Sequence, residues 1–246
     1  MCLIAVAWQV HPAYPLVLAA NRDEFHARPT AAADWWPDAP GIFGGRDLQA
    51  GGTWLGASRH GRFAAITNVR EPDSPLGKCS RGALTAAFLQ SELSAARFSE
   101  TVQYEDYAGF NLLLGDGKSL IYCSNREDSA RELPPGIYGL SNHRLDTPWP
   151  KLLKLRSAMA ECLDELPSTA ALFRLLSDTT IAPDHELPAT GVSLAWERVL
   201  SAIFVTTEGY GTRASTVLLQ ASDGSMQLEE HSFAADGTRS TVLLGG

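Results

Sequence analysis

The order of its predicted secondary structure is the feature of this 246-residue sequence that most constrains its fold. Apolar, β-prone segments at 2–10 and 16–21 flank a turn cluster and predict an N-terminal hairpin. Further strands, a helix, strands, two helices and a last group of strands follow, without strict alternation of strand and helix. This order disfavours Rossmann and TIM-barrel folds. It predicts an α+β fold in which two mostly antiparallel sheets carry helices on their outer faces.

Local patterns predict the bounds of several elements. A helix is expected over 80–93, capped by Ser80, with one face that combines Ala83, Leu84, Ala87 and Phe88. Pro150 is expected to begin another helix, because the first turn does not need its missing amide proton. Residues 31–40 are interpreted as a surface loop and residues 199–206 as a strand.

Composition limits the class of protein. The net charge of −8, without a Lys/Arg run, disfavours binding to nucleic acid. We see no repeat or linker and predict a single domain over 1–246. The N-terminal apolar run is about eight residues long and lacks a basic flank, so we expect neither a signal peptide nor a transmembrane segment.

The cysteines and histidines do not predict a metal site. Cys2, Cys79, Cys123 and Cys162 are widely spaced and include no Cys-x-x-Cys pair, which argues against a disulfide scaffold and against zinc. No pair of histidines has the spacing of a metal site. Free cysteines suit a reducing compartment, and we therefore expect a cytoplasmic protein.

Cys2 is the strongest candidate for a catalytic nucleophile. Methionine is readily removed before a small second residue, and its removal would place a thiol and an α-amine on one residue. The amine titrates near ~7.7–8.0 and the thiol near ~8.5, so the amine can take the thiol proton without a histidine. The alternative is that Cys2 is a small apolar residue of a core strand.

Other candidates lie at the ends of predicted strands. Asn21, Arg22, Asp23 and Glu24 follow the second strand, where a carboxylate could hold the α-ammonium and Arg22 could bind a substrate carbonyl or carboxylate. The alternative is a charged turn closed by internal ion pairs.

Glycines and aromatic residues suggest a ligand pocket. Gly52 and Trp54 belong to a glycine-rich segment that could approach a ligand, or could equally form a bend beside a core tryptophan. Asn68 and Asn142 could donate to an oxyanion or merely shape turns. Arg213 could point into a site or remain a surface residue at a strand start.

Taken together, these segments resemble the NRDE proteins, also called the transport and Golgi organisation family. The segments that carry the resemblance are Met1-Cys2, Leu18–Pro29, Gly51–Gly56, Ala64–Asn68, Gly109–Leu114, Tyr138–Asn142, Thr147–Lys151 and Tyr210–Thr216. The resemblance implies an N-terminal-nucleophile (Ntn) hydrolase-like fold, a four-layer αββα sandwich, similar in outline to penicillin V acylase and bile-salt hydrolase.

The resemblance also implies roles for individual residues. Cys2 would attack an amide with help from Arg22 and Asp23, while Asn68 and Asn142 would match the two oxyanion donors. The acylase pattern separates its Arg and Asp by two residues, whereas Arg22 and Asp23 are adjacent, so either Asp23 or Glu24 could face the α-amine. Asn21, Glu24, Gly52, Trp54 and Arg213 are expected to contact substrate.

Two functions follow from this resemblance. The first is an amidohydrolase that cleaves a non-peptide C–N bond of a small or acylated substrate through an acyl-enzyme, without a cofactor. An acyltransferase would use the same intermediate. The second is a carrier of haem or an acyl-lipid, with Trp8, Trp35, Trp36 and Trp54 lining an apolar cleft. The sequence identifies neither the substrate nor the oligomeric state.

Overall fold

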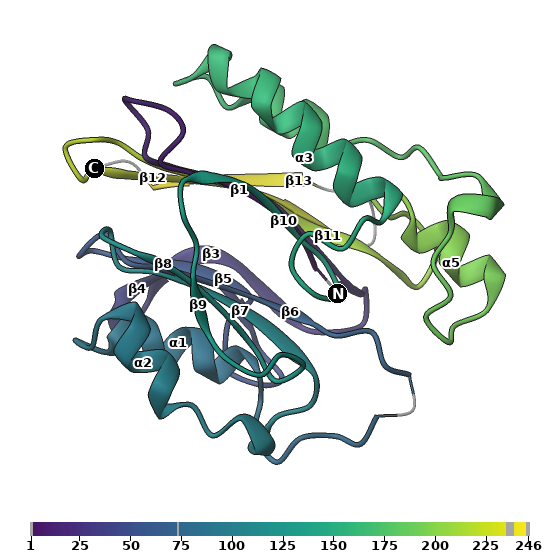
Figure 1. Cartoon of the computed structure of the whole chain (residues 1–246), viewed down its shortest axis with the longest axis horizontal. Coiled ribbons are helices and arrows are strands. Elements are labelled where there is room, and N and C mark those ends of the chain that lie inside the picture. Colours follow the sequence, from purple (N-terminus) through teal and green to yellow (C-terminus); the bar gives the residue numbers. More distant parts are fainter. Residues whose placement is uncertain (1, 73, 235–238, 245–246) are drawn as a thin grey trace.

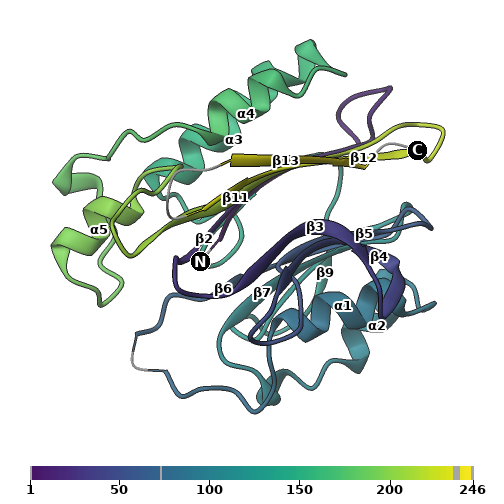
Figure 2. The same cartoon turned by 180° about the vertical axis from the view of Figure 1, so that it is seen from behind.

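The computed structural model of the protein describes residues 2–72, 74–234 and 239–244. These residues form two antiparallel sheets that lie face to face, with helices on the outer face of each, so that four layers result (Figures 1 and 2). The expected α+β sandwich of two antiparallel sheets is confirmed.

The first sheet combines strands from both ends of the chain with one from its middle. Its order is β10 (Gly136–Leu140), β1 (Cys2–Trp8), β2 (Leu16–Phe25), β11 (Tyr210–Gln220), β12 (Met226–Phe233) and β13 (Arg239–Leu244). Its outer face is covered by α3 (Pro150–Cys162) and α4 (Ala170–Leu176), and α5 (Leu194–Leu200) lies beyond one end of the sheet (Figure 1).

The second sheet follows the chain order. It consists of β3 (Thr30–Trp36), β4 (Ala39–Asp47), β5 (Leu55–Ser58), β6 (Phe63–Asn68), β7 (Phe110–Gly115), β8 (Leu120–Ser124) and β9 (Arg131–Glu132). Two helices, α1 (Gly82–Gln90) and α2 (Ala95–Thr101), cover its outer face (Figure 2).

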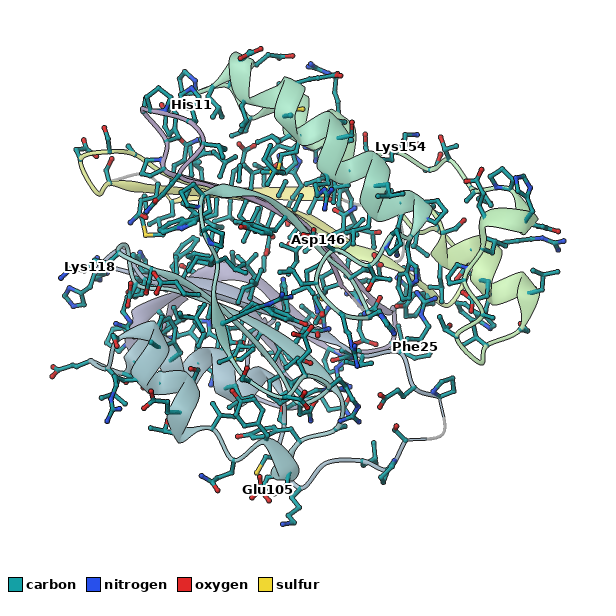
Figure 3. All side chains as sticks on the ribbon, viewed as in Figure 1. His11, Phe25, Glu105, Lys118, Asp146 and Lys154 are labelled. Carbon is teal, nitrogen blue, oxygen red and sulfur yellow. The ribbon has the colours of Figure 1, made fainter. Side chains whose placement is uncertain are left out.

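Apolar side chains pack between the layers, and strand β1 shows why the N-terminal run is almost continuously hydrophobic. Ile4, Val6 and Trp8 belong to the core between the sheets. Leu3 and Ala5 belong to the core beneath α3 and α4. Because successive side chains of a strand point to opposite faces, a strand buried on both faces needs apolar residues throughout. Side chains fill the space between the two sheets (Figure 3).

Strand β2 extends further than the sequence predicted. It continues through the polar segment to Phe25, because β11 pairs with it up to Tyr210 opposite Phe25. The neighbouring strand supplies partners for the backbone of these polar residues, so they form part of the sheet rather than a charged turn.

Two segments were assigned wrongly. Residues 31–40 are not a surface loop but contribute to β3 and β4, with Ala33 and Trp36 buried. Irregular register between these strands hides the alternation expected of a strand. Residues 199–206 are not a strand. They begin in α5 and continue as irregular chain that forms a single β-bridge at Thr206.

Helix α1 begins two residues later than predicted. Its N-cap is Arg81 rather than Ser80, and no side chain caps it. Ala83 and Ala87 are exposed, whereas Leu84 and Phe88 are buried as expected. In contrast, α3 begins at Pro150, which confirms that prediction.

Asn21 fastens the helical layer to the first sheet. Its Nδ2 donates to the carbonyl oxygens of Leu176 (2.8 Å) and Ile203 (2.9 Å), and its Oδ1 accepts from Ser215 Oγ (2.6 Å). The side chain is fully buried on the helix side of the sheet. One residue therefore joins β2, β11 and the ends of two segments of the helical layer.

We expect Asn21→Ala to lower the free energy of unfolding by about 2–4 kcal/mol, because it leaves two buried carbonyls and a hydroxyl without their partner. Urea unfolding measures this loss. Gln49→Ala, which truncates an exposed amide in the β4–β5 turn, should leave stability unchanged. Equal stability of the two variants would contradict this role of Asn21.

Candidate functional site

A cavity of about 380 Å³ opens where β1 and β2 face the second sheet. The residues around it come from β1 and β2, from the β4–β5 and β6–β7 segments, and from the chain that enters α1. They include Cys2, Arg22, Asp23, Glu24, Arg28, Asp47, Gly52, Thr53, Trp54, Ile66, Asn68, Leu76, Lys78, Cys79, Ser80, Arg81 and Gly82. Most of the candidates from the sequence are thus brought to one place.

Cys2 and Arg22 both line this cavity. They are register partners in the β1–β2 hairpin and therefore project from the same face of the sheet. Cys2 is 9% exposed. Burial raises the pKa of the Cys2 thiol, whereas the neighbouring Arg22 guanidinium lowers it. The arginine thus offsets part of the cost of forming a buried thiolate.

Arg22 is held in place mainly by an aromatic ring. Its Cζ lies 4.3 Å from the centroid of the Trp54 ring, and its Nη1 donates to Thr30 Oγ1 at 3.2 Å. A side chain at Gly45 would overlap the Trp54 ring. The absence of a side chain at residue 45 therefore leaves room for the Trp54 ring beside the guanidinium.

The two adjacent carboxylates have different surroundings. Successive residues of β2 alternate between faces, so Glu24 shares the face of Arg22 and Cys2, whereas Asp23 points to the helix side. Asp23 accepts a hydrogen bond from Thr212 Oγ1 at 2.8 Å, and burial raises the pKa of its carboxyl group. The Glu24 carboxylate accepts from the Phe25 amide at 2.9 Å.

This arrangement bears on the choice between Asp23 and Glu24 as partner of the α-amine. Cys2 is opposite Arg22, so Asp23 is the first residue beyond the paired end of β1. Asp23 is therefore placed near the backbone nitrogen of Cys2, which would be the free α-amine after removal of Met1. Met1 lies outside the described residues, so its predicted removal stays a prediction.

A buried layer of charged groups lies behind Asp23. The Arg70 and Glu197 side chains form an ion pair of 3.0 Å and are only 5% and 4% exposed. Lys151, in the first turn of α3, is 4% exposed, and burial lowers its pKa to about 8 while the Asp23 carboxylate opposes this shift. The negative charges of Asp23 and Glu197 thus offset the positive charges of Arg70 and Lys151.

Asn68 and Asn142 are in contact. Asn142 Nδ2 donates to the Asn68 carbonyl oxygen at 2.9 Å, and Ser141 Oγ donates to the Cys2 carbonyl oxygen at 3.4 Å. The Asn142 side chain is fully buried, and only Asn68 lines the cavity.

The amide of Asn68 is directed away from β7. The next amide, Val69, donates to the Gly109 carbonyl, and Phe110, the register partner of Asn68, donates instead to Asn125 Oδ1. Because amides alternate between the two edges of a strand, the Asn68 N–H points to the edge where β5 has already ended. It therefore faces the region of Gly52, a lining residue.

The remaining candidates have structural contacts. Gly52 packs so closely on Gly82 that a side chain at 52 would overlap the backbone that begins α1. Arg213 lies outside the cavity lining and donates to the carbonyls of Phe25 (3.1 Å), His26 (3.1 Å) and Arg28 (3.3 Å). Asn21 lies on the opposite face of the sheet, as described above.

Only one of the four tryptophans expected to line a ligand cleft does so. Trp54 lines the cavity, whereas Trp8 belongs to the core between the sheets. Trp36 Nε1 donates to the Gly44 carbonyl at 2.9 Å, and Trp35 packs edge-on against Phe43. The cavity wall is therefore more polar than the predicted apolar cleft.

Sequence reasoning missed four residues of this region: Arg70, Cys79, Arg81 and Lys151. Lys151 is buried on the same side of α3 as its apolar residues. A lysine that interrupts the apolar face of a helix is the signal in the sequence that could have identified it. Arg81 and Cys79 lie in an irregular segment, where sequence does not determine side-chain direction.

The match to known proteins covers almost the whole chain. The family model described as Transport and Golgi organisation 2 matches residues 1–235. The chain belongs to this family.

Relatives in the family span similar lengths. The bovine (Bos taurus) Transport and Golgi organization protein 2 homolog is 38% identical over 265 residues, which cover 97% of this chain and 96% of the relative. The Homo sapiens homolog is 35% identical, covering 95% and 93%. The Drosophila melanogaster Transport and Golgi organization protein 2 is 28% identical, covering 95% and 92%.

A solved structure shows the same fold. The Caenorhabditis elegans ortholog of N-acylethanolamine-hydrolyzing acid amidase aligns with a TM-score of 0.51 at 13% identity, over 89% of this chain and 92% of that one. The family member described here thus has an Ntn-hydrolase-like fold. None of its described helices is long and apolar enough to cross a lipid bilayer.

Lys151 gives the protein a characteristic pH dependence. Between about pH 8 and 10.5, the unfolded chain retains the proton that folded Lys151 has lost, so stability rises with pH in this window and is lost as pH falls through 8. We expect the free energy of unfolding of the wild type to rise relative to that of Lys151→Met, by on the order of 3 kcal/mol.

Urea unfolding of both proteins at several pH values between 7 and 11 measures this difference. Lys118→Met, which removes an exposed lysine from the β7–β8 turn, is the matched control and should give a profile parallel to that of the wild type. Parallel profiles for wild type and Lys151→Met would show that Lys151 is not deprotonated in the folded protein.

Proposed function

We propose that this protein is an N-terminal-cysteine amidohydrolase that cleaves a non-peptide C–N bond through an acyl-enzyme on Cys2. The observation that carries the proposal is the pairing of Cys2 with Arg22 at the wall of the cavity. Further support comes from the fold shared with an N-acylethanolamine-hydrolyzing acid amidase, a protein that acts on an amide.

The first step is activation of the thiol. After removal of Met1, the α-amine of Cys2 accepts the thiol proton, and the Arg22 guanidinium stabilises the resulting thiolate. Asp23, placed beyond the paired end of β1, stabilises the α-ammonium that forms. Burial raises the pKa of the Asp23 carboxyl group, and a neighbouring ammonium opposes that effect.

The second step is attack on the carbonyl carbon of the amide. The new C–S bond pushes the carbonyl electrons onto oxygen, and the Asn68 N–H is the candidate donor to this oxyanion, whereas Asn142, which does not line the cavity, positions Asn68. The contact between Asn142 Nδ2 and the Asn68 carbonyl fixes the two asparagines relative to each other. Such positioning reduces the reorganisation required in the transition state.

The third step breaks the C–N bond. The α-ammonium returns its proton to the leaving nitrogen, and an amine and a thioester result. Water then attacks the thioester, the α-amine accepts a proton from this water, and the collapse of the second intermediate releases a carboxylic acid and the free thiol.

Acylation of Cys2 can be tested without the natural substrate. We expect p-nitrophenyl hexanoate to add one hexanoyl group to the wild-type protein, located on the N-terminal peptide, because the ester bypasses the need for a specific amine leaving group. Intact-protein and peptide mass spectrometry measure the adduct. The intact mass also shows whether Met1 has been removed.

The chain supplies a matched control for this experiment. Cys79 lines the same cavity but is exposed, and Cys79→Ala should retain the adduct that Cys2→Ala loses. Equal acylation of the wild type and Cys2→Ala would end the proposal.

The α-amine mechanism makes a separate prediction. A variant with an uncleaved N-terminal extension retains the thiol but has an amide instead of the amine, so it loses its base. We expect its rate of acylation to fall by about 10²-fold or more, the usual contribution of a general base. The same extension at the C-terminus is the control. Unchanged acylation of the N-terminally extended protein would exclude the amine as the base.

A further inference from the structure

The N-terminus of helix α1 faces the cavity that contains Cys2. Ser80, Arg81 and Gly82, which lead into this nine-residue helix, all line the cavity. The side chain of the N-cap residue, Arg81, does not cap the helix, and the first turn contains no acidic residue. The amides of Ala83 and Leu84 already donate to the carbonyl oxygens of Ser80 (3.1 Å) and Arg81 (3.0 Å), so the helix end contributes mainly its partial positive charge, which favours a bound anion.

Two guanidinium groups face the same cavity without a carboxylate partner. Arg22 is 5% exposed and is held by Trp54 and Thr30, and Arg81 Nη1 donates to the Gly109 carbonyl at 3.1 Å. Among the residues that the structure describes, neither arginine lies within ion-pair distance of an acid. Burying a guanidinium without an anion is costly, so such groups usually bind one.

The other charged side chains of the cavity interact with one another. Arg28 pairs with Asp47 at 2.7 Å, and Lys78 pairs with Asp106 at 2.7 Å. Glu24 is 3.9 Å from the Arg28 guanidinium, and Asp23 points to the layer of Lys151. Arg28 thus interacts with two carboxylates, Glu24 and Asp47, whereas Arg22 and Arg81 make no ion pair among the described residues.

We propose that Arg81, Arg22 and the uncapped N-terminus of α1 form an anion subsite beside Cys2, and that the substrate carries a carboxylate or phosphate group near the carbonyl that Cys2 attacks. Cys2, Arg22 and Arg81 line the same cavity, so the subsite lies beside the nucleophile. In a cavity of about 380 Å³, the anion and the scissile bond must belong to one small head group. The reference to a scissile bond rests on the function proposed above, whereas the anion subsite itself does not.

Binding to Cys2→Ala tests the subsite independently of turnover. The probes are N-hexanoylglycine, N-hexanoyl-O-phosphoethanolamine and the neutral N-hexanoylethanolamine, which share one acyl chain and differ in the charge of the head group. We expect at least one anionic probe to bind about tenfold tighter or more than the neutral one in low salt, as measured by calorimetry. The stronger of the two anions identifies the group as carboxylate or phosphate.

Variants of Arg81 locate the preference. Arg81→Gln in the Cys2→Ala background should abolish most of the discrimination, and Arg81→Lys should restore part of it, because the charge returns without the planar fork. Arg97→Gln, which removes an exposed arginine of α2, should change nothing. Thermal unfolding confirms that each variant is folded.

Three results would overturn the proposal: equal affinity for the neutral and anionic probes, full discrimination in Arg81→Gln, or the same loss in Arg97→Gln. A protein that binds anions selectively but is never acylated at Cys2 would refute the proposed hydrolase and leave the subsite intact. The two proposals therefore fail in different measurements.

Discussion

The register of β1 against β2 is the constraint on which the candidate site depends. Cys2 pairs with Arg22, and β1 is also paired along its other edge with β10. A shift of this register by one residue would turn Cys2 to the helix side. It would also move Leu3 and Ala5 out of the core beneath α3 and α4. The cost of moving a whole strand of buried side chains keeps the thiol and the guanidinium on one wall of the cavity.

Side chains at the polar end of β2 alternate between the two faces of the sheet. Arg22 and Glu24 face the cavity, whereas Asn21 and Asp23 face the helices. Asn21 ties the helical layer to the sheet, and Asp23 joins a buried set of charges that is neutral only when all its members are present. The charge of the cavity on one face of the strand is therefore coupled to the charge balance on the other face.

Much of this arrangement could be predicted from the sequence, and the limits have physical causes. The order of elements was sufficient to predict two antiparallel sheets, and the N-terminal hairpin was sufficient to bring Cys2 near the end of the second strand. The face on which Asp23 and Glu24 lie depends on how far β11 extends the pairing of β2, which is a contact of almost 200 residues in separation.

Tertiary packing also explains why the sequence patterns did not indicate Arg81 and Lys151. Arg81 enters the cavity because α1 begins at Gly82, against the backbone of Gly52, and Lys151 is buried because α3 lies over β1 and β10. Residues 31–40 were misread because Ala, Trp and Pro do not alternate in a way that reveals β3 and β4. Local pattern specifies elements, whereas tertiary packing decides which side chains meet.

The place of β1 inside its sheet has a consequence for the life of the newly made chain. β1 is an interior strand that pairs with β10 on one edge and with β2 on the other. β2 in turn pairs with β11, which is synthesised some 200 residues after β1. At ordinary rates of translation this delay is roughly 10–40 s. During that time the first residues are exposed to processing enzymes, whereas in the finished fold Cys2 is nearly buried. The removal of Met1 that the proposed mechanism requires is therefore easiest before β11 has paired with β2.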